Sequence, residues 1–105
     1  MPGVNQITLH AMLSAREALR YTPAGLPAIE CTLDHRSEQH EAGGQRRVEC
    51  ELHAVAFGDV ALALRDCAIG SVLRVEGFIA RRYRRGTSVA LHLTRFERIA
   101  TTKGI

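Results

Sequence analysis

Residues 48–65 read VECELHAVAFGDVALALR, and the spacing of their apolar residues changes partway along the segment. Up to residue 56 apolar side chains occupy alternate positions, which is typical of a half-buried strand. From Val60 to Leu64 the chain is instead rich in Ala and Leu, which favour a helix, with Asp59 placed to cap the first amides and Arg65 suited to the C-terminal end. The segment therefore predicts a strand followed directly by one short helix, which Gly70 can end.

Two further strands are predicted on each side of this segment. Apolar and polar residues alternate over residues 7–13 and 29–35 before it, and over residues 73–79 and 89–93 after it. Ser14 and Glu17 also fit a helix capping box, but we interpret this stretch as an extension of the first strand with a bulge. Turn-forming residues at 22–27, a polar run at 37–45 and a loop around 84–86 connect the strands.

The predicted order is strand, strand, strand, helix, strand, strand, which is the element order of the OB-fold. We therefore predict an all-β protein, a five-stranded Greek-key barrel with one short helix between strands three and four. It would form a single domain over residues 1–105. In this fold, strands two and three and the loops after strands one and four commonly bind oligonucleotides.

Composition is that of an ordinary globular protein. The 105 residues and 11.6 kDa suit one domain, and 46% apolar with 24% charged residues argue against disorder. The longest apolar runs have about five residues, whereas a membrane helix needs roughly 20. The N-terminus lacks the basic region of a secretory signal. We therefore expect a cytoplasmic protein without a membrane segment.

The three cysteines, Cys31, Cys50 and Cys67, are an odd number without a C-x-x-C pair, which argues against a disulfide framework or a zinc ribbon. Cys31, Cys50, His35 and His40 are four zinc-type ligands, but their spacing matches no common paired motif. Strand parity places Cys31, His35 and Cys50 on apolar faces, so we expect buried thiols, no metal and no cofactor. Motifs for a catalytic nucleophile, a phosphate loop or a metalloprotease do not occur, so we do not expect an enzyme.

Basic charge is concentrated near the C-terminus. Thirteen of the fourteen basic residues are Arg, and residues 81–105 carry seven basic residues and one acid, a net charge of +6, whereas residues 1–80 carry a net charge of −3. Such a local excess is typical of a phosphate-binding patch, although a solvated charged surface has the same composition.

The strongest binding candidate is the segment Arg81-Arg82-Tyr83-Arg84-Arg85 between the last two strands. Its guanidinium groups suit phosphates and Tyr83 offers a ring to an unstacked base. Stacking should be sparse, because there is no Trp, and we interpret Phe57, Phe78 and Phe96 as packing or interface residues. Further candidates are expected on the same barrel face, where together they would form one groove: Arg20, Tyr21, Arg36, Arg46 and Arg47.

Several short stretches, weak singly, are specific together in their order and spacing. They are Pro23-Ala24-Gly25-Leu26-Pro27, Leu33-Asp34-His35-Arg36-Ser37, Glu41-Ala42-Gly43, Gly70-Ser71, Gly77-Phe78-Ile79 and Leu91-His92. By these stretches the chain resembles the primosomal replication protein N (PriB) family, a relative of single-stranded DNA-binding protein (SSB), over about residues 4–99.

The resemblance implies a homodimer of OB-folds that binds single-stranded DNA and joins the replication restart primosome with the PriA helicase, DnaT and SSB. By position, the family's basic binding residues fall on Arg20, Arg36 and the loop 81–85. This sequence departs from the family at two stacking aromatics, which fall on Glu49 and Gly44.

Two other functions remain open. One is a generic single-stranded DNA-binding protein, which we disfavour because the chain ends at Ile105 without the flexible tail and acidic terminal motif expected of SSB. The other is a protein–protein adaptor with little DNA affinity, whose basic loop contacts an acidic partner.

Overall fold

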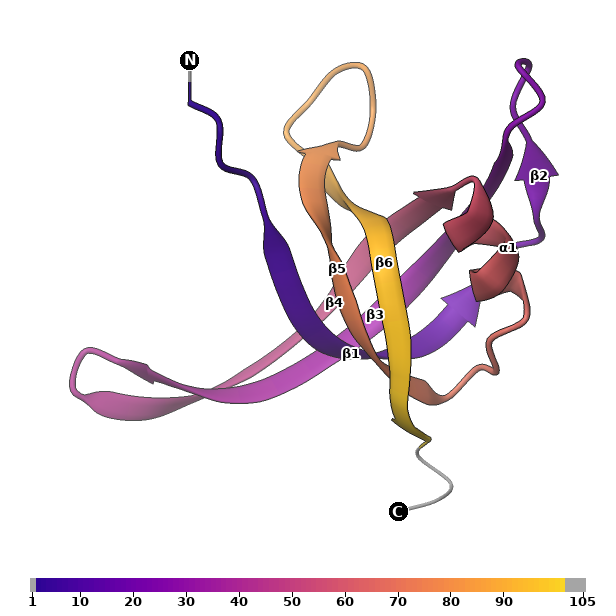
Figure 1. Ribbon diagram of the computed structural model, residues 1–105. Coiled ribbons are helices and arrows are strands. Elements are labelled where there is room, and N and C mark those ends of the chain that lie inside the picture. The colour runs from indigo at the N-terminus through magenta and orange to yellow at the C-terminus, as the bar shows by residue number, and fades with distance from the viewer. Residues whose placement is uncertain (1, 102–105) are drawn as a thin grey trace.

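The computed structural model describes residues 2–101, so Lys103, which contributes to the predicted basic excess, lies outside the described residues. Six strands and one helix follow each other along the chain (Figure 1). They are β1 (Ile7–Arg16), β2 (Arg20–Tyr21), β3 (Pro27–Glu41), β4 (Gly44–Phe57), α1 (Asp59–Arg65), β5 (Ser71–Arg81) and β6 (Val89–Thr101).

Five of the strands close into a barrel. The sheet order is β1-β5-β6-β4-β3-β2, and a further pairing of β1 with β3 closes the barrel and leaves β2 outside it. All neighbours are antiparallel except β4 and β6, which run parallel. The predicted OB-fold with a helix between its third and fourth strands is thus confirmed. The two-residue strand β2 is an addition that the sequence did not predict.

The strand β1 serves both edges of the barrel because it changes partner along its length. Residues 7–12 pair with β5, and residues from Met12 onward pair with β3. The register with β3 shifts between Leu13 and Ala15, which makes Ser14 the extra residue of a bulge. This confirms the interpretation as a bulged strand rather than a capped helix.

The core lies inside the barrel, where residues such as Leu13, Leu33 and Val75 have no exposed surface. Ala61 and Leu64 of α1 belong to the same cluster, so the helix covers one end of the barrel. Two details of the helix prediction are wrong. Its N-cap residue is Gly58, without a side-chain cap bond, and Asp59 lies in the first turn. The helix also ends at Arg65, well before Gly70.

The predicted polar loop at residues 37–45 is wrong, because these residues form the end of a long β-hairpin. Pairing of β3 with β4 continues out to Glu41 and Gly44. The turn residues Ala42 and Gly43 have φ values of 53° and 81°, as a two-residue type I′ turn requires. Figure 1 shows this hairpin projecting from the barrel. We call residues 35–50 the arm.

The arm also explains why the prediction of a buried Cys50 is wrong. Cys31 is 3% exposed in the barrel, whereas Cys50 is exposed and Cys67 is intermediate. Cys50 pairs with His35, just beyond the point where β1 stops covering β3. Parity placed both thiols on the same face of the ribbon, but only the part of that face inside the barrel is covered.

Among the described residues there is no helix that is long and apolar enough to span a membrane.

Candidate nucleic-acid interface

A depression of about 490 Å³ lies where the loop between β5 and β6 meets β2, β3 and β4. It contains four of the predicted binding residues, drawn from segments far apart in the sequence. Its walls combine guanidinium groups, aromatic rings and one carboxylate: Arg20, Glu30, His53, Val55, Phe57, Arg81, Arg82, Tyr83, Ala90 and His92.

The first two arginines of the loop are not ion-paired. Within residues 2–101, neither Arg81 nor Arg82 has an ion-pair partner. The backbone NH of Arg82 donates to the carbonyl of Ser88 at 2.8 Å, which closes the base of the loop. The Arg82 guanidinium carbon lies 5.0 Å from the centroid of the Tyr83 ring, within cation–π range. These two guanidinium groups are therefore available to an anion.

Arg84 and Arg85 are exposed at the tip of the same loop but do not line the depression. Tyr83 is 57% exposed and contributes to the wall. Tyr21 is 63% exposed on β2, outside the lining. The loop therefore places two of its arginines in the depression and two outside its lining.

Three aromatic rings lie side by side on the barrel surface, across β4, β6 and β5. The rings of Phe78 and His92 have centroids 4.9 Å apart and an interplanar angle of 17°, and those of Phe57 and His92 are 6.0 Å apart at 29°. Phe57 and Phe78 are each 37% exposed. An added Cβ at Gly77 would lie 1.9 Å from the carbonyl oxygen of His92, so this glycine permits the close approach of β5 and β6 beside the rings.

Sequence reasoning missed Phe57 and His92 as candidate residues for this site. Phe57 was interpreted as a packing or interface residue, yet it lines the depression. Its parity could have identified it, because it alternates with the buried Ala54 and Ala56 and shares the outward side of β4 with Val55. His92 pairs directly with Phe78 in the register of β5 and β6.

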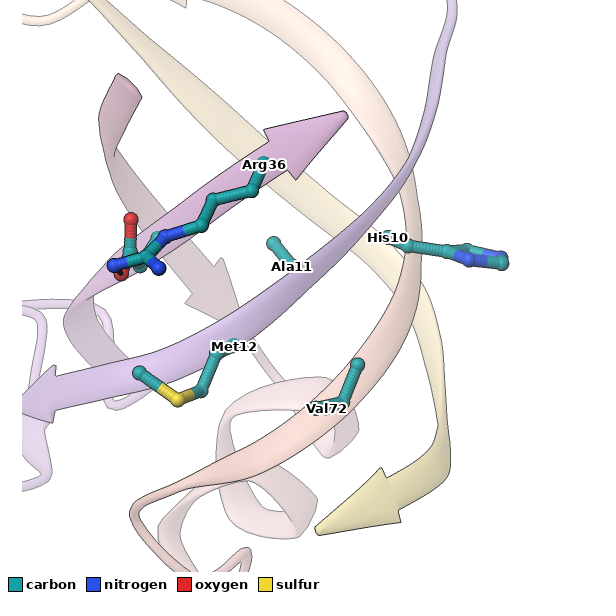
Figure 2. Close-up of a pocket in the computed structure, with 6 residues that line it drawn as sticks. His10, Ala11, Met12, Arg36 and Val72 are labelled. Carbon is teal, nitrogen blue, oxygen red and sulfur yellow. Dashed lines mark ion pairs between the residues drawn. The ribbon is translucent and has the colours of Figure 1, made fainter. Parts of the chain in front are cut away.

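Arg36 lies in a different place. It borders a groove of about 420 Å³ formed by β1, β3 and β5 (Figure 2). Its guanidinium is 3.8 Å from a carboxylate oxygen of Asp34 and 4.0 Å from one of Glu49. Figure 2 shows the Arg36 side chain reaching over the side of the groove where Met12 lies, while His10 points away. Arg36 thus lies beside two carboxylates and outside the depression that holds Arg20, Arg81 and Arg82.

Arg46 and Arg47 lie near the tip of the arm, on opposite faces of the ribbon. Arg46 donates from Nη1 to Oε1 of Glu41 at 2.9 Å, and Arg47 is paired in register with Glu38. Between them and the depression, the outer face of β3 and β4 carries Asp34, Glu49 and Glu51. The predicted basic residues therefore form three separate groups, with carboxylates between them.

The predicted zinc-type ligands are also apart. Cys31 is buried in the barrel and Cys50 is exposed on the arm. His35 is engaged at both ring nitrogens, with Nδ1 2.7 Å from the His10 carbonyl oxygen and Nε2 2.9 Å from the Ser37 hydroxyl. Within the described part of the chain, no group of three or more His, Cys, Asp or Glu side chains could hold a metal ion.

Comparison with known proteins gives a consistent result. Residues 5–95 match a family model whose description is "Another single-strand binding protein family". The replication restart protein PriB of Bordetella pertussis is 46% identical over 101 residues, which cover 96% of this chain and 94% of that protein.

Solved structures show the same relationship. A structure of PriB from Ralstonia solanacearum superposes with a TM-score of 0.85 and 35% sequence identity, covering 91% of this chain and 98% of the other. A deletion mutant of the single-stranded DNA binding protein from Thermus aquaticus superposes with a TM-score of 0.72 and 26% identity, covering 92% of this chain and 51% of the other.

Proposed function

Since this chain belongs to the PriB family of replication restart proteins, which share the fold of single-strand binding proteins, we propose that it binds single-stranded DNA through the depression beside the β5–β6 loop. The observation that carries this proposal is that exposed rings and the guanidinium groups of Arg81 and Arg82, which have no ion-pair partner among the described residues, converge on one concave surface. Members of this family are binding proteins, and this agrees with the expectation that the chain is not an enzyme.

The basic and the aromatic side chains of the depression have different parts in holding a single strand. Arg81 and Arg82 donate charge-assisted hydrogen bonds to phosphates. Tyr83 and the outward ring of Phe57 offer surfaces on which bases stack. Because stacking accepts any base and a phosphate contact reads no base edge, we expect little sequence preference.

The test is a fluorescence titration of labelled single-stranded oligonucleotides at several salt concentrations. Replacing Arg81, Arg82, Arg84 and Arg85 with Ala should lower affinity and flatten the slope of log K against log salt. Four phosphate contacts on one strand contribute about −3 to that slope, at roughly −0.7 per phosphate. As a matched control, Ala at Arg95 and Arg98, which lie beside α1 in another groove, should leave the slope nearly unchanged. An unchanged slope in the loop variant would remove the loop from the DNA site.

A specific observation favours a second candidate, a protein–protein adaptor. Asp34, Glu49 and Glu51 on the outer face of β3 and β4 would repel a strand laid along that face. If oligonucleotides bind weakly in the titration while a labelled acidic peptide binds and competes for the same loop, the adaptor function replaces the DNA-binding one.

We further propose that the chain acts in the cytoplasm as a homodimer that joins the PriA helicase, DnaT and SSB, as the family resemblance implies. Support comes from the relatedness over nearly the whole chain to proteins named for replication restart. Sedimentation of the labelled chain with each purified partner tests these contacts separately. A sedimentation coefficient that does not change with any of the three partners would contradict this part of the proposal.

A further inference from the structure

Glu30 is the only carboxylate among the described residues that line the depression. It lies on β3, and both of its oxygens are engaged. Oε2 is 3.2 Å from Nη2 of Arg20, and Oε1 is 2.8 Å from Nε2 of His53. The Glu30 side chain is 27% exposed and that of Arg20 is 51% exposed. The Glu30 carboxylate therefore already accepts the hydrogen bond that the Arg20 guanidinium would otherwise donate to an anionic ligand in the depression.

This arrangement makes Glu30 a competitor of the phosphate. A carboxylate and a phosphate both accept hydrogen bonds from a guanidinium through paired oxygens, so Arg20 cannot fully engage both. The negative charge of Glu30 also acts on a phosphate held by Arg81 or Arg82 in the same depression. Resting on the proposed DNA-binding function, we propose that Glu30 is a built-in counter-charge that a single strand must displace from Arg20, and that it sets the affinity of the site below its maximum.

The surroundings permit this exchange. An ion pair as exposed as that of Arg20 with Glu30 is weak, so a phosphate can replace the carboxylate at the guanidinium. His53 is 17% exposed and remains 2.8 Å from the other carboxylate oxygen. When Arg20 turns to the strand, Glu30 therefore keeps a hydrogen-bond partner and is not left alone in the wall of the depression. The site can release DNA by the reverse exchange.

The first test is Glu30→Gln, which removes the charge and retains a side chain of the same shape. At low salt, we expect oligonucleotides to bind the Glu30→Gln protein roughly three- to tenfold more tightly than they bind the unchanged protein. The slope of log K against log salt should steepen by up to roughly 0.7, because Arg20 is no longer neutralised within the protein. Glu30→Ala, which also lacks the hydrogen-bond acceptor, should show the same sign of change. Equal or weaker binding by both folded variants overturns the proposal.

Glu51→Gln is the matched control. Glu51 lies on the outer face of the neighbouring strand, paired in register with Asp34, and does not line the depression. Removing this charge should change affinity by less than the Glu30 substitution does. An equal gain from both variants would show that net charge alone is responsible and would overturn the specific role of Glu30.

A double-mutant cycle identifies Arg20 as the group through which Glu30 acts. Arg20→Gln should weaken binding, and the gain from Glu30→Gln should be smaller in the Arg20→Gln protein than in the unchanged one. An equal gain in both proteins would overturn competition for Arg20. The proposed function fails separately, if none of these proteins binds oligonucleotides at any salt concentration.

Discussion

Cys31 and Cys50 share a side of the β3–β4 ribbon, yet their thiols have different surroundings. Cys31 lies in the barrel core with Leu33 and Ala54, and its burial raises the pKa of the thiol to about 12. Nearby Arg16 opposes that rise of the pKa, and Cys67 adds to it. Cys50 is exposed on the arm. The thiols should therefore differ in reactivity although their sequence patterns are alike.

We predict that a thiol reagent labels Cys50 quickly in the native protein and Cys31 slowly. Only the thiolate attacks such reagents. A pKa of about 12 instead of 9.0 reduces the thiolate fraction of Cys31 roughly a thousandfold, and burial also restricts access. Mass spectrometry of chains labelled for increasing times measures this, with a Cys50→Ser protein as the control. Rapid labelling of the control at Cys31 would contradict the burial of that thiol.

The pH dependence of stability provides a second prediction for Cys31. Its thiol has a pKa of about 12 in the folded chain and an ordinary value of 9.0. The unfolded chain therefore binds fewer protons between these values, and the free energy of unfolding should fall as pH rises above 9, by at most about 1.4 kcal/mol per pH unit. Well below pH 9 the thiol is protonated in both states and contributes no slope.

Urea unfolding at a series of pH values measures this slope. The Cys31→Ala protein serves as the control, because it lacks the thiol and should lose less stability on passing from pH 9 to higher pH. Parallel pH profiles for the two proteins would show that Cys31 titrates alike in both states.

At the scale of elements, the strands of the barrel could be predicted and the arm could not, for one physical reason. Alternation appears where one face of a strand is buried, as in residues 7–13 and 73–79, which form β1 and β5. From residue 37 to residue 47 both faces of the ribbon meet solvent, so polar residues occupy nearly every position and the strand signal disappears. The turn at Ala42-Gly43 was not predicted either, because Ala is not a residue that this turn favours.

We therefore predict that Ala42→Asn stabilises the arm. Ala42 has a φ of 53°, in the left-handed region. Most residues with a Cβ are strained there, but Asn is better tolerated because its short polar side chain can hydrogen-bond to the nearby backbone. The substitution should stabilise the hairpin by about 1 kcal/mol. Hydrogen exchange of amides in the arm measures the change, with barrel amides as an internal reference. Faster exchange in the arm of the variant would contradict the turn geometry.

The candidate site was predictable at the loop and at Arg20 but not at its other residues, because its parts come from different elements. The run of arginines from 81 to 85 is visible in the sequence, and element order places it near the residues that precede β3. Nothing in the sequence shows that Glu30 lies beside Arg20, or that His92 lies between Phe57 and Phe78. Those contacts depend on the strand register.

At the scale of the whole molecule, the barrel has one strand edge that the described residues leave unpaired. Residues 7–11 of β1 pair with β5 along one edge, and among the described residues no strand pairs with their other edge. An apolar depression of about 330 Å³ adjoins it, lined in part by Ile7, Leu9, Leu52, Ile79 and Val89. Two such edges paired across a two-fold axis would satisfy the backbone groups and cover these side chains.

We accordingly predict a homodimer, with a mass by light scattering of about 23 kDa, twice the 11.6 kDa of the chain. Ile79→Arg should yield folded monomers, because Ile79 is 39% exposed and a charge there would be buried by the partner. The matched control is Ile99→Arg, since Ile99 is 45% exposed but does not line the apolar depression beside β1. It should remain dimeric. A mass of 11.6 kDa for the unchanged protein at micromolar concentration would exclude the dimer, and monomers from both variants would place its interface elsewhere.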